Sequence, residues 1–235
     1  MDRVVLDGGM SALCAEIAAL HNAAMLSWNI KTAAAHLADA DPRFGEIIER
    51  IGVCRMKLHP VTQPFPSLLH AIVYQQLSGK AASTILGRVL ALFPRKAPTP
   101  AGLLALSDEQ LRGAGMSRGK VLAARDLAEK VLDGSVPKLP ALKRMDDEEI
   151  MERLTAVRGI GPWSAEMFLM FRLGRPDILP VGDLAIRKGY QIGWNKRKPP
   201  DPKALAKYGR RWAPYRTAAA WYLWAIVDED GGGWD

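Results

Sequence analysis

The run Arg158-Gly-Ile-Gly161 joins an expected helix over 150–157 to a second helix that begins at Pro162. Two glycines at these places let backbones approach closely and adopt unusual dihedral angles. The second helix then presents free N–H groups at its first turn, and such a terminus binds phosphate without any side chain. An ordinary helical hairpin with a glycine cap has the same spacing, so the run alone leaves both interpretations open.

Asp183 is a second candidate for chemistry. It follows Val181-Gly182 and stands where another helix is expected to start. Backbone amides at a helix start favour the ionised form of a capping carboxylate. Capping is the usual role of an aspartate in such a place, and the alternative is a carboxylate at the edge of a pocket near the hairpin.

Positive charge is concentrated in one segment, residues 184–216. The chain has 32 Lys and Arg against 25 Asp and Glu, a net charge of +7. The segment contains ten basic residues and one acidic residue, so it carries +9 and the remainder −2. A basic surface on a near-neutral body is typical of a polyanion-binding protein, although a solvated face without a partner gives the same count.

The elements that must position these residues are helices. Apolar residues recur at helical spacing between proline and glycine breaks, and strand signals are almost absent, so the sequence predicts an all-α fold. At about 150 residues per domain, the 235 residues form one two-lobed domain or two small ones. The segment Pro64-Phe-Pro66 is expected to be a hinge. The expected helices cover residues 10–39, 44–53, 67–93 (two helices with a turn near Ser78-Gly79), 117–132, 150–157, 162–173, a helix from Asp183, and 214–227.

Composition excludes several classes of protein. With 49% hydrophobic and 24% charged residues, the chain is not disordered, collagenous or a coiled coil. Two cysteines cannot build a disulfide scaffold, a four-thiolate zinc site or an iron–sulfur cluster, and the four histidines have no zinc-binding spacing. The longest apolar run, 218–227, is too short to span a bilayer, and no secretory signal is expected. We therefore expect a cytoplasmic protein with no membrane partner.

Four motifs stand along the chain in a fixed order. They are AIVYQQLSGKA at 71–81, LTAVRGIGPWSA at 154–165, LPVGDLAIR at 179–187, and WAPYR at 212–216 with Trp224 beyond it. In this order, over roughly residues 36–228, the sequence resembles the helix–hairpin–helix (HhH-GPD) DNA glycosylase superfamily. Within it, the sequence resembles the AlkA-type 3-methyladenine DNA glycosylase II branch.

The resemblance implies hydrolysis of the N-glycosidic bond of alkylated purines in duplex DNA, the first step of base excision repair, by a monomer. Asp183 matches the catalytic aspartate, whose carboxylate stabilises an oxocarbenium-like sugar and orients or deprotonates the attacking water. Trp163 stands where lyase-capable relatives carry a Schiff-base lysine. Water should therefore be the nucleophile, and the enzyme monofunctional.

The resemblance also implies a pocket for a base that has left the duplex. Trp163 and Trp224 match aromatic residues that stack on the base, which is cationic in 3-methyladenine. Gln75 and Met167 match pocket-lining positions, and Gln76 matches the side chain that fills the gap in the base stack. By spacing alone, the two tryptophans and Met167 would be core residues, and the two glutamines a polar pair at a helix end.

Further contacts follow from the same resemblance. A DNA phosphate is expected at the amides near Gly159, Gly161 and Trp163, and other phosphates at the side chains of Lys80, Arg187 and Lys188. A monovalent cation is expected at the backbone carbonyls of Thr155, Val157 and Ile160. No other cofactor is expected, and no metal held by side chains. Each basic residue individually could equally serve solubility.

The resemblance implies two lobes with the DNA cleft and base pocket between them, without the N-terminal β-rich domain of longer members. The expected parts are an N-terminal extension of unclear role over 1–35 and a glycosylase domain over 36–235, with one lobe at about 67–180 (hairpin 150–173) and the other formed from 36–66 plus 181–228. Two other functions stay open. One is a non-catalytic helix–hairpin–helix DNA-binding module, and the other is a glycosylase for uracil, hypoxanthine or an oxidised purine.

Overall fold

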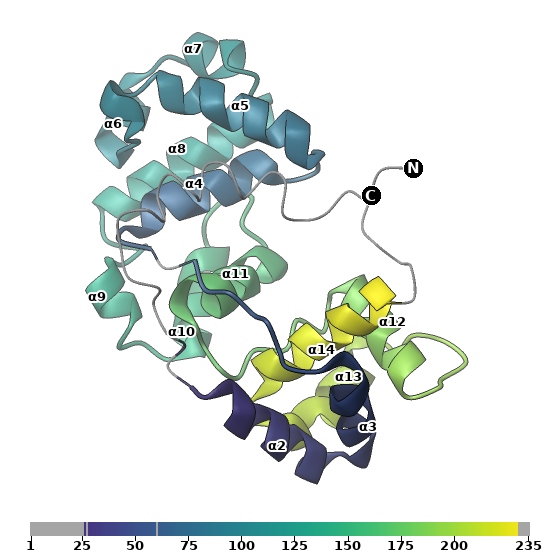
Figure 1. The fold of residues 1–235 in the computed structure, drawn as a ribbon. Helices are drawn as coiled ribbons and strands as arrows, with labels where there is room; N and C mark the ends of the chain where they lie inside the picture. Colours follow the sequence, from purple (N-terminus) through teal and green to yellow (C-terminus); the bar gives the residue numbers. More distant parts are fainter. Residues whose placement is uncertain (1–25, 27, 60, 230–235) are drawn as a thin grey trace. The chain divides into compact units, whose positions relative to one another are not determined.

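The computed structural model describes residues 26, 28–59 and 61–229 (Figure 1). Over these residues every regular element is a helix, which confirms the predicted all-α fold. They divide into two compact units: unit 1 contains residues 61–168, and unit 2 contains residues 26, 28–59 and 169–229. No helix in this part of the chain is long and apolar enough to cross a membrane.

Unit 1 is built around α8, which packs against α4, α6 and α7. Val121 and Leu127 on α8 and Ile72 on α4 are buried in its core. The helices of unit 1 are α4 (Pro64–Tyr74), α5 (Gly79–Ala91), η1 (Pro94–Lys96), α6 (Pro100–Ala105), α7 (Asp108–Gly113), α8 (Arg118–Leu132), α9 (Leu139–Leu142), α10 (Asp147–Thr155) and α11 (Pro162–Phe168).

Side-chain caps set the start of several of these helices. Ser107 forms a capping box with Gln110 at the start of α7, and Asp146 accepts the Glu149 N–H at the start of α10. The predicted hinge at Pro64-Phe-Pro66 is misplaced by a few residues, because unit 1 begins at residue 61 and these three residues form the first turn of α4. A proline is tolerated there because the first helical turn needs no donor from it.

Unit 2 combines an early segment of the chain with its C-terminal part. The long helix α14 packs against α12, α2 and α3. Phe44 and Trp212 are fully buried and meet edge to face, with ring centroids 5.1 Å apart. The helices of unit 2 are α2 (Ile30–Ala40), α3 (Pro42–Ile51), the π-helical η2 (Leu169–Leu173), α12 (Leu184–Gly193), α13 (Pro202–Gly209), η3 (Arg210–Trp212) and α14 (Arg216–Glu229).

The unit boundaries differ from the lobe limits expected near residues 67 and 180. Residues 169–180 belong to unit 2, because Arg216 pairs with Asp177 and the Thr217 hydroxyl bonds the backbone of residues 175 and 178. Residues 1–25 of the expected N-terminal extension lie outside the described residues. Residues 30–35 belong to α2, where Ala33 is fully buried.

Candidate functional site

The predicted hairpin is present in unit 1, where α10 and α11 contact each other on either side of a short turn. Gly159 has a φ of +77°, and a Cβ there would lie 3.1 Å from Cβ of Ala123 on α8. Both the left-handed backbone and the close approach therefore require glycine at this position. Gly161 is exposed with open space around it, while Ile160 between the glycines is buried.

Trp163 lies in the first turn of α11, and 51% of its surface is exposed. Such exposure excludes the alternative that it is an ordinary core residue. Met167, one turn later, is half-buried. The second hairpin helix was expected to run to residue 173, and it does so in two parts, α-helical to Phe168 and π-helical from Leu169 to Leu173.

The two glutamines form the turn that follows α4. Gln75 Nε2 donates a hydrogen bond of 2.7 Å to the carbonyl of Gly159. Gln76 is exposed and has a φ of +56°, an uncommon conformation for a residue with a side chain. The amide of Gln75 therefore bridges this turn to the hairpin, a contact that the sequence did not predict.

The carbonyls of Thr155, Val157 and Ile160, where a monovalent cation is expected, all belong to the end of α10 and the hairpin turn. The Val157 carbonyl accepts the Ile160 N–H at 3.0 Å. In the described part of the chain, no group of three or more His, Cys, Asp or Glu side chains could hold a metal ion. The cation site stays a prediction.

Asp183 is the N-cap of α12 in unit 2, as predicted. Its Oδ1 accepts the N–H groups of Ala185 at 2.7 Å and Ile186 at 3.1 Å. The side chain is half-buried, and the two bonds fix the plane and direction of the carboxylate.

The loop that leads to Asp183 is held by the start of α14. Arg216 pairs with Asp177 through two parallel bonds, Nε to Oδ1 at 2.7 Å and Nη2 to Oδ2 at 2.8 Å. The buried Thr217 hydroxyl donates to the carbonyl of Arg175 at 2.7 Å and accepts the N–H of Ile178 at 3.0 Å. Sequence reasoning noted Arg216 only as part of a motif and of the basic segment, and missed Asp177 and Thr217. The available signal was Thr217 itself, a hydroxyl directly after the motif arginine and before three alanines. A hydroxyl in such an apolar helix needs polar partners when it is buried.

Close packing of α12 on α14 sets the direction of the helix that Asp183 caps. A Cβ at Gly189 would lie 2.7 Å from the carbonyl carbon and 3.0 Å from the Cα of Leu223, so the two backbones touch. Trp224, which follows Leu223 on α14, is half-buried and stacks on Phe171, with ring centroids 6.1 Å apart. Phe171 is an aromatic neighbour that the sequence did not single out.

The predicted phosphate-binding side chains differ in their exposure and in their hydrogen bonds. Lys80 and Lys188 are exposed. Arg187 is half-buried, and its Nη1 donates to the carbonyl of Pro200 at 3.4 Å. That bond ties α12 to the loop before α13, so Arg187 has a structural contact in addition to the predicted one.

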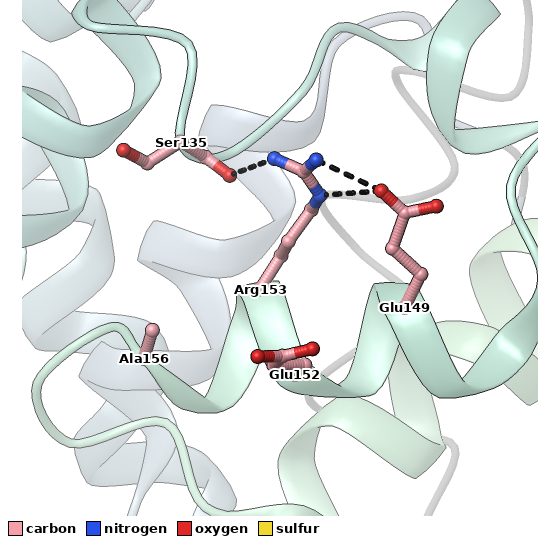
Figure 2. A pocket seen from close by; sticks show the side chains of 5 residues that line it. All are labelled: Ser135, Glu149, Glu152, Arg153 and Ala156. Carbon is pink, nitrogen blue, oxygen red and sulfur yellow. Dashed lines mark hydrogen bonds and ion pairs between the residues drawn. The ribbon is translucent and has the colours of Figure 1, made fainter.

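A separate pocket of about 310 Å³ lies beside α10 in unit 1 (Figure 2). Arg153 occupies its wall, donating to Glu149 Oε1 at 3.0 and 2.8 Å and to the carbonyl of Ser135 at 3.4 Å. Glu152 and Ala156 complete the lining. None of the residues predicted to hold a base lines this pocket.

A family model and individual relatives both match this chain. The model of the HhH-GPD superfamily of base excision DNA repair proteins matches residues 69–214. The chain is 35% identical to DNA-3-methyladenine glycosylase 1 of Schizosaccharomyces pombe over 191 residues, which cover 80% of this chain and 84% of that protein.

Two solved structures share the fold. One is the 3-methyladenine DNA glycosylase of S. pombe in complex with abasic DNA, with a TM-score of 0.74 and 34% identity over 84% of this chain and 97% of that one. The other is a DNA-3-methyladenine glycosidase from Bacillus halodurans, with a TM-score of 0.78 and 38% identity over 86% of this chain and 92% of that one.

Proposed function

Because the chain belongs to the HhH-GPD superfamily of base excision DNA repair proteins, we propose that it is a monofunctional DNA glycosylase for alkylated purines of the 3-methyladenine type. It hydrolyses the N-glycosidic bond in duplex DNA and so initiates base excision repair. The observation that carries the proposal is the 35% identity to a DNA-3-methyladenine glycosylase over 80% of the chain.

Asp183 is the proposed catalytic residue. The bond between C1′ and the base nitrogen breaks with development of positive charge on the sugar, and a carboxylate beside C1′ stabilises that charge. Two backbone N–H groups of α12 already hold Asp183 Oδ1, so the carboxylate does not need to reorganise during the reaction. A water oxygen then bonds to C1′, and Asp183 orients that water or takes its proton.

The leaving group explains why a single carboxylate suffices. A 3-methylated adenine is cationic in the nucleotide and leaves as a neutral base, so it needs little help from a general acid. Trp163 presents an exposed indole, whose face attracts a cation and stacks on a base. Tryptophan cannot form a Schiff base, so the product is an intact strand with an abasic site.

The proposed partner is duplex DNA that carries alkylated bases, bound by a monomer. The relative solved with abasic DNA supports this partner, as does the basic segment 184–216, in which Lys188 is exposed. Gln76 is proposed to fill the space of the extruded base, and the amides near Gly161 to hold a phosphate. A substrate in chromosomal DNA places the enzyme at the nucleoid in a bacterial cell.

The test is base release from methylated duplex DNA by the wild type, Asp183→Asn and Asp201→Asn. Asparagine retains an oxygen that can cap α12, so the fold and DNA affinity should survive. Asp201 caps α13 in the same unit by accepting the Ala204 N–H at 2.9 Å, so Asp201→Asn is the matched control. We expect the wild type and the control to release 3-methyladenine, and Asp183→Asn to bind DNA and release nothing.

Other outcomes separate the alternatives. If the wild type binds duplexes but releases no base from methylated, uracil, hypoxanthine or 8-oxoguanine substrates, the protein is a non-catalytic DNA-binding module. If it releases only one of the last three bases, it is a glycosylase for a different lesion.

A further inference from the structure

One face of α8 contacts the end of α4 and one of the two turns of unit 1 that the proposed function uses. Lys120, Ala123 and Asp126 are three residues apart in succession, so they share one side of the helix. We call the turn Gln75–Ser78 the wedge turn and the turn Arg158–Gly161 the hairpin turn. Lys120 contacts Val73 in the last turn of α4, two residues before the wedge turn, whereas Ala123 and Asp126 contact the hairpin turn.

Lys120 fixes the end of α4. Its Nζ donates a hydrogen bond of 2.7 Å to the carbonyl of Val73, one of the last carbonyls of that helix, which lack partners within it. Burial lowers the pKa of Lys120. The backbone reaches the positive φ of Gln76 only three residues later, so the bond holds the start of a turn with an unfavourable conformation.

Asp126 fixes the hairpin turn. Its Oδ2 accepts the backbone N–H of Arg158 at 2.7 Å, and its Oδ1 is paired with Lys130. Burial raises the pKa of this carboxyl, but the hydrogen bonds from Lys130 and from Arg158 outweigh burial and leave the pKa below its ordinary value. A carboxylate that accepts a backbone N–H makes a strong, directional bond.

Two more contacts join the turns. Ala123 lies directly beneath Gly159, with 3.1 Å between its Cβ and the place where a Cβ of residue 159 would be. Gln75 Nε2 donates to the carbonyl of Gly159 at 2.7 Å. The hairpin turn is therefore held from α8 on its N–H side at Arg158 and from the wedge turn on its carbonyl side at Gly159.

We propose that Lys120, Ala123 and Asp126, with Gln75, form a bracket that fixes the spacing between the wedge turn and the hairpin turn, and that Asp126 is a positioning residue for base excision. The inference rests on the proposed function. Successive nucleotides of one strand are separated by about 3.4 Å along the helix axis. If one turn shifts against the other by a fraction of that distance, Gln76 cannot fill the space of the extruded base while the hairpin turn holds the phosphate of the same lesion.

The test compares Asp126→Ala with Asp126→Asn. Asparagine keeps an oxygen for the Arg158 N–H, whereas alanine removes it. Ser107→Ala is the matched control, because Ser107 accepts a backbone N–H from Gln110 at 3.3 Å at the start of α7 and contacts neither turn. The readouts are amide hydrogen exchange at Arg158, the single-turnover rate of base release from methylated DNA, and affinity for an undamaged duplex.

For Asp126→Ala we expect exchange at Arg158 to be faster, and base release slower, by about tenfold each, the effect of losing one charge-assisted hydrogen bond. Affinity for undamaged DNA should not fall, because the substitution removes a negative charge. Asp126→Asn should restore most of both losses, and Ser107→Ala should change neither. A rate that falls while non-specific affinity does not is inconsistent with mere partial unfolding.

Gln75→Ala adds a second measurement, because it acts on the same turn. The double variant with Asp126→Ala should lose less activity than the product of the two single losses. Unchanged exchange and unchanged rate in Asp126→Ala, no rescue by asparagine, or independent losses in the double variant would each overturn the bracket. If the wild type itself releases no base, the proposed function fails, and exchange at Arg158 still decides whether Asp126 holds the turn.

Discussion

Gly189→Ala is the sharpest single test of how Asp183 is positioned. Gly189 lies six residues after Asp183, on the helix that Asp183 caps. An added Cβ would overlap the carbonyl oxygen of Leu223 and would stand 2.7 Å from its carbonyl carbon and 3.0 Å from its Cα. Carbon atoms pack at about 3.5–4.0 Å and the carbonyl oxygen is nearer still, so α12 and α14 must separate by at least about 1 Å. The obstacle is backbone in the middle of a helix, which cannot rotate away as a side chain can.

Two effects of opposite sign determine the stability of this variant. Alanine is the better helix former by about 1 kcal/mol, whereas overpacking a tight core costs about 1–3 kcal/mol. The net loss in the free energy of unfolding is therefore about 0–2 kcal/mol, and we expect the upper end, about 2 kcal/mol, because the obstacle is backbone. The effect on activity should be larger, since a displacement of about 1 Å at a catalytic group can cost about 100-fold in rate.

Gly87→Ala is the matched control for this prediction. Gly87 is an exposed residue within α5, and a Cβ there would meet no atom within 4 Å. The control should gain up to about 1 kcal/mol of stability and keep full activity. Urea unfolding and single-turnover base release measure the two quantities. If Gly189→Ala is as stable and as active as Gly87→Ala, the backbone contact between α12 and α14 does not position Asp183.

Three further predictions concern single side chains. Trp163→Ala should weaken binding to lesion-containing DNA by about 1–3 kcal/mol, the value of one base–aromatic stack, while the protein stays folded, because the indole is 51% exposed; equal affinity in a fluorescence titration would exclude stacking. Arg216→Met should slow base release more than it weakens DNA binding, because the loop held through Asp177 leads to Asp183; a loss confined to DNA affinity would instead assign Arg216 to phosphate contact. Burial raises the pKa of the Cys54 thiol to about 11 from 9.0. Above pH 9 the thiol therefore ionises first in the unfolded state, and the wild type should lose stability relative to Cys54→Ala by up to about 1.4 kcal/mol per pH unit. Parallel urea curves for these two proteins between pH 8 and 10 would contradict that sign.

Features encoded by neighbouring residues could be predicted from the sequence. The start of α12 at Asp183 and the turn at Gly159 both depend on caps and backbone conformations within a few residues. The error at Pro64-Phe-Pro66 is of the same local kind, because a proline either breaks a helix or begins one, and only the packing of α4 decides between them.

Contacts between distant residues could not be predicted in this way. Gln75 and Gly159 are 84 residues apart, and Arg216 and Asp177 are 39 residues apart. The sequence spacing does not identify the partner of Gln75 or of Arg216, because the partner depends on which helices pack together. The sequence therefore predicted Gln75 as a pocket residue and could not show that its amide bonds the hairpin turn.

The polar residues of the two units divide into those that fix backbone and those that face outward, and this division has a consequence for specificity. Asp126, Arg216 and Thr217 hold turns or loops through bonds to neighbouring groups. Trp163 and Gln76 are exposed, Trp163 in the first turn of α11 and Gln76 in the turn that follows α4. Substitutions at the second group can change which base is held while the frame that orients Asp183 stays intact. Substitutions at the first group should lower the rate on every substrate alike, so comparing two lesions in one variant separates positioning from recognition.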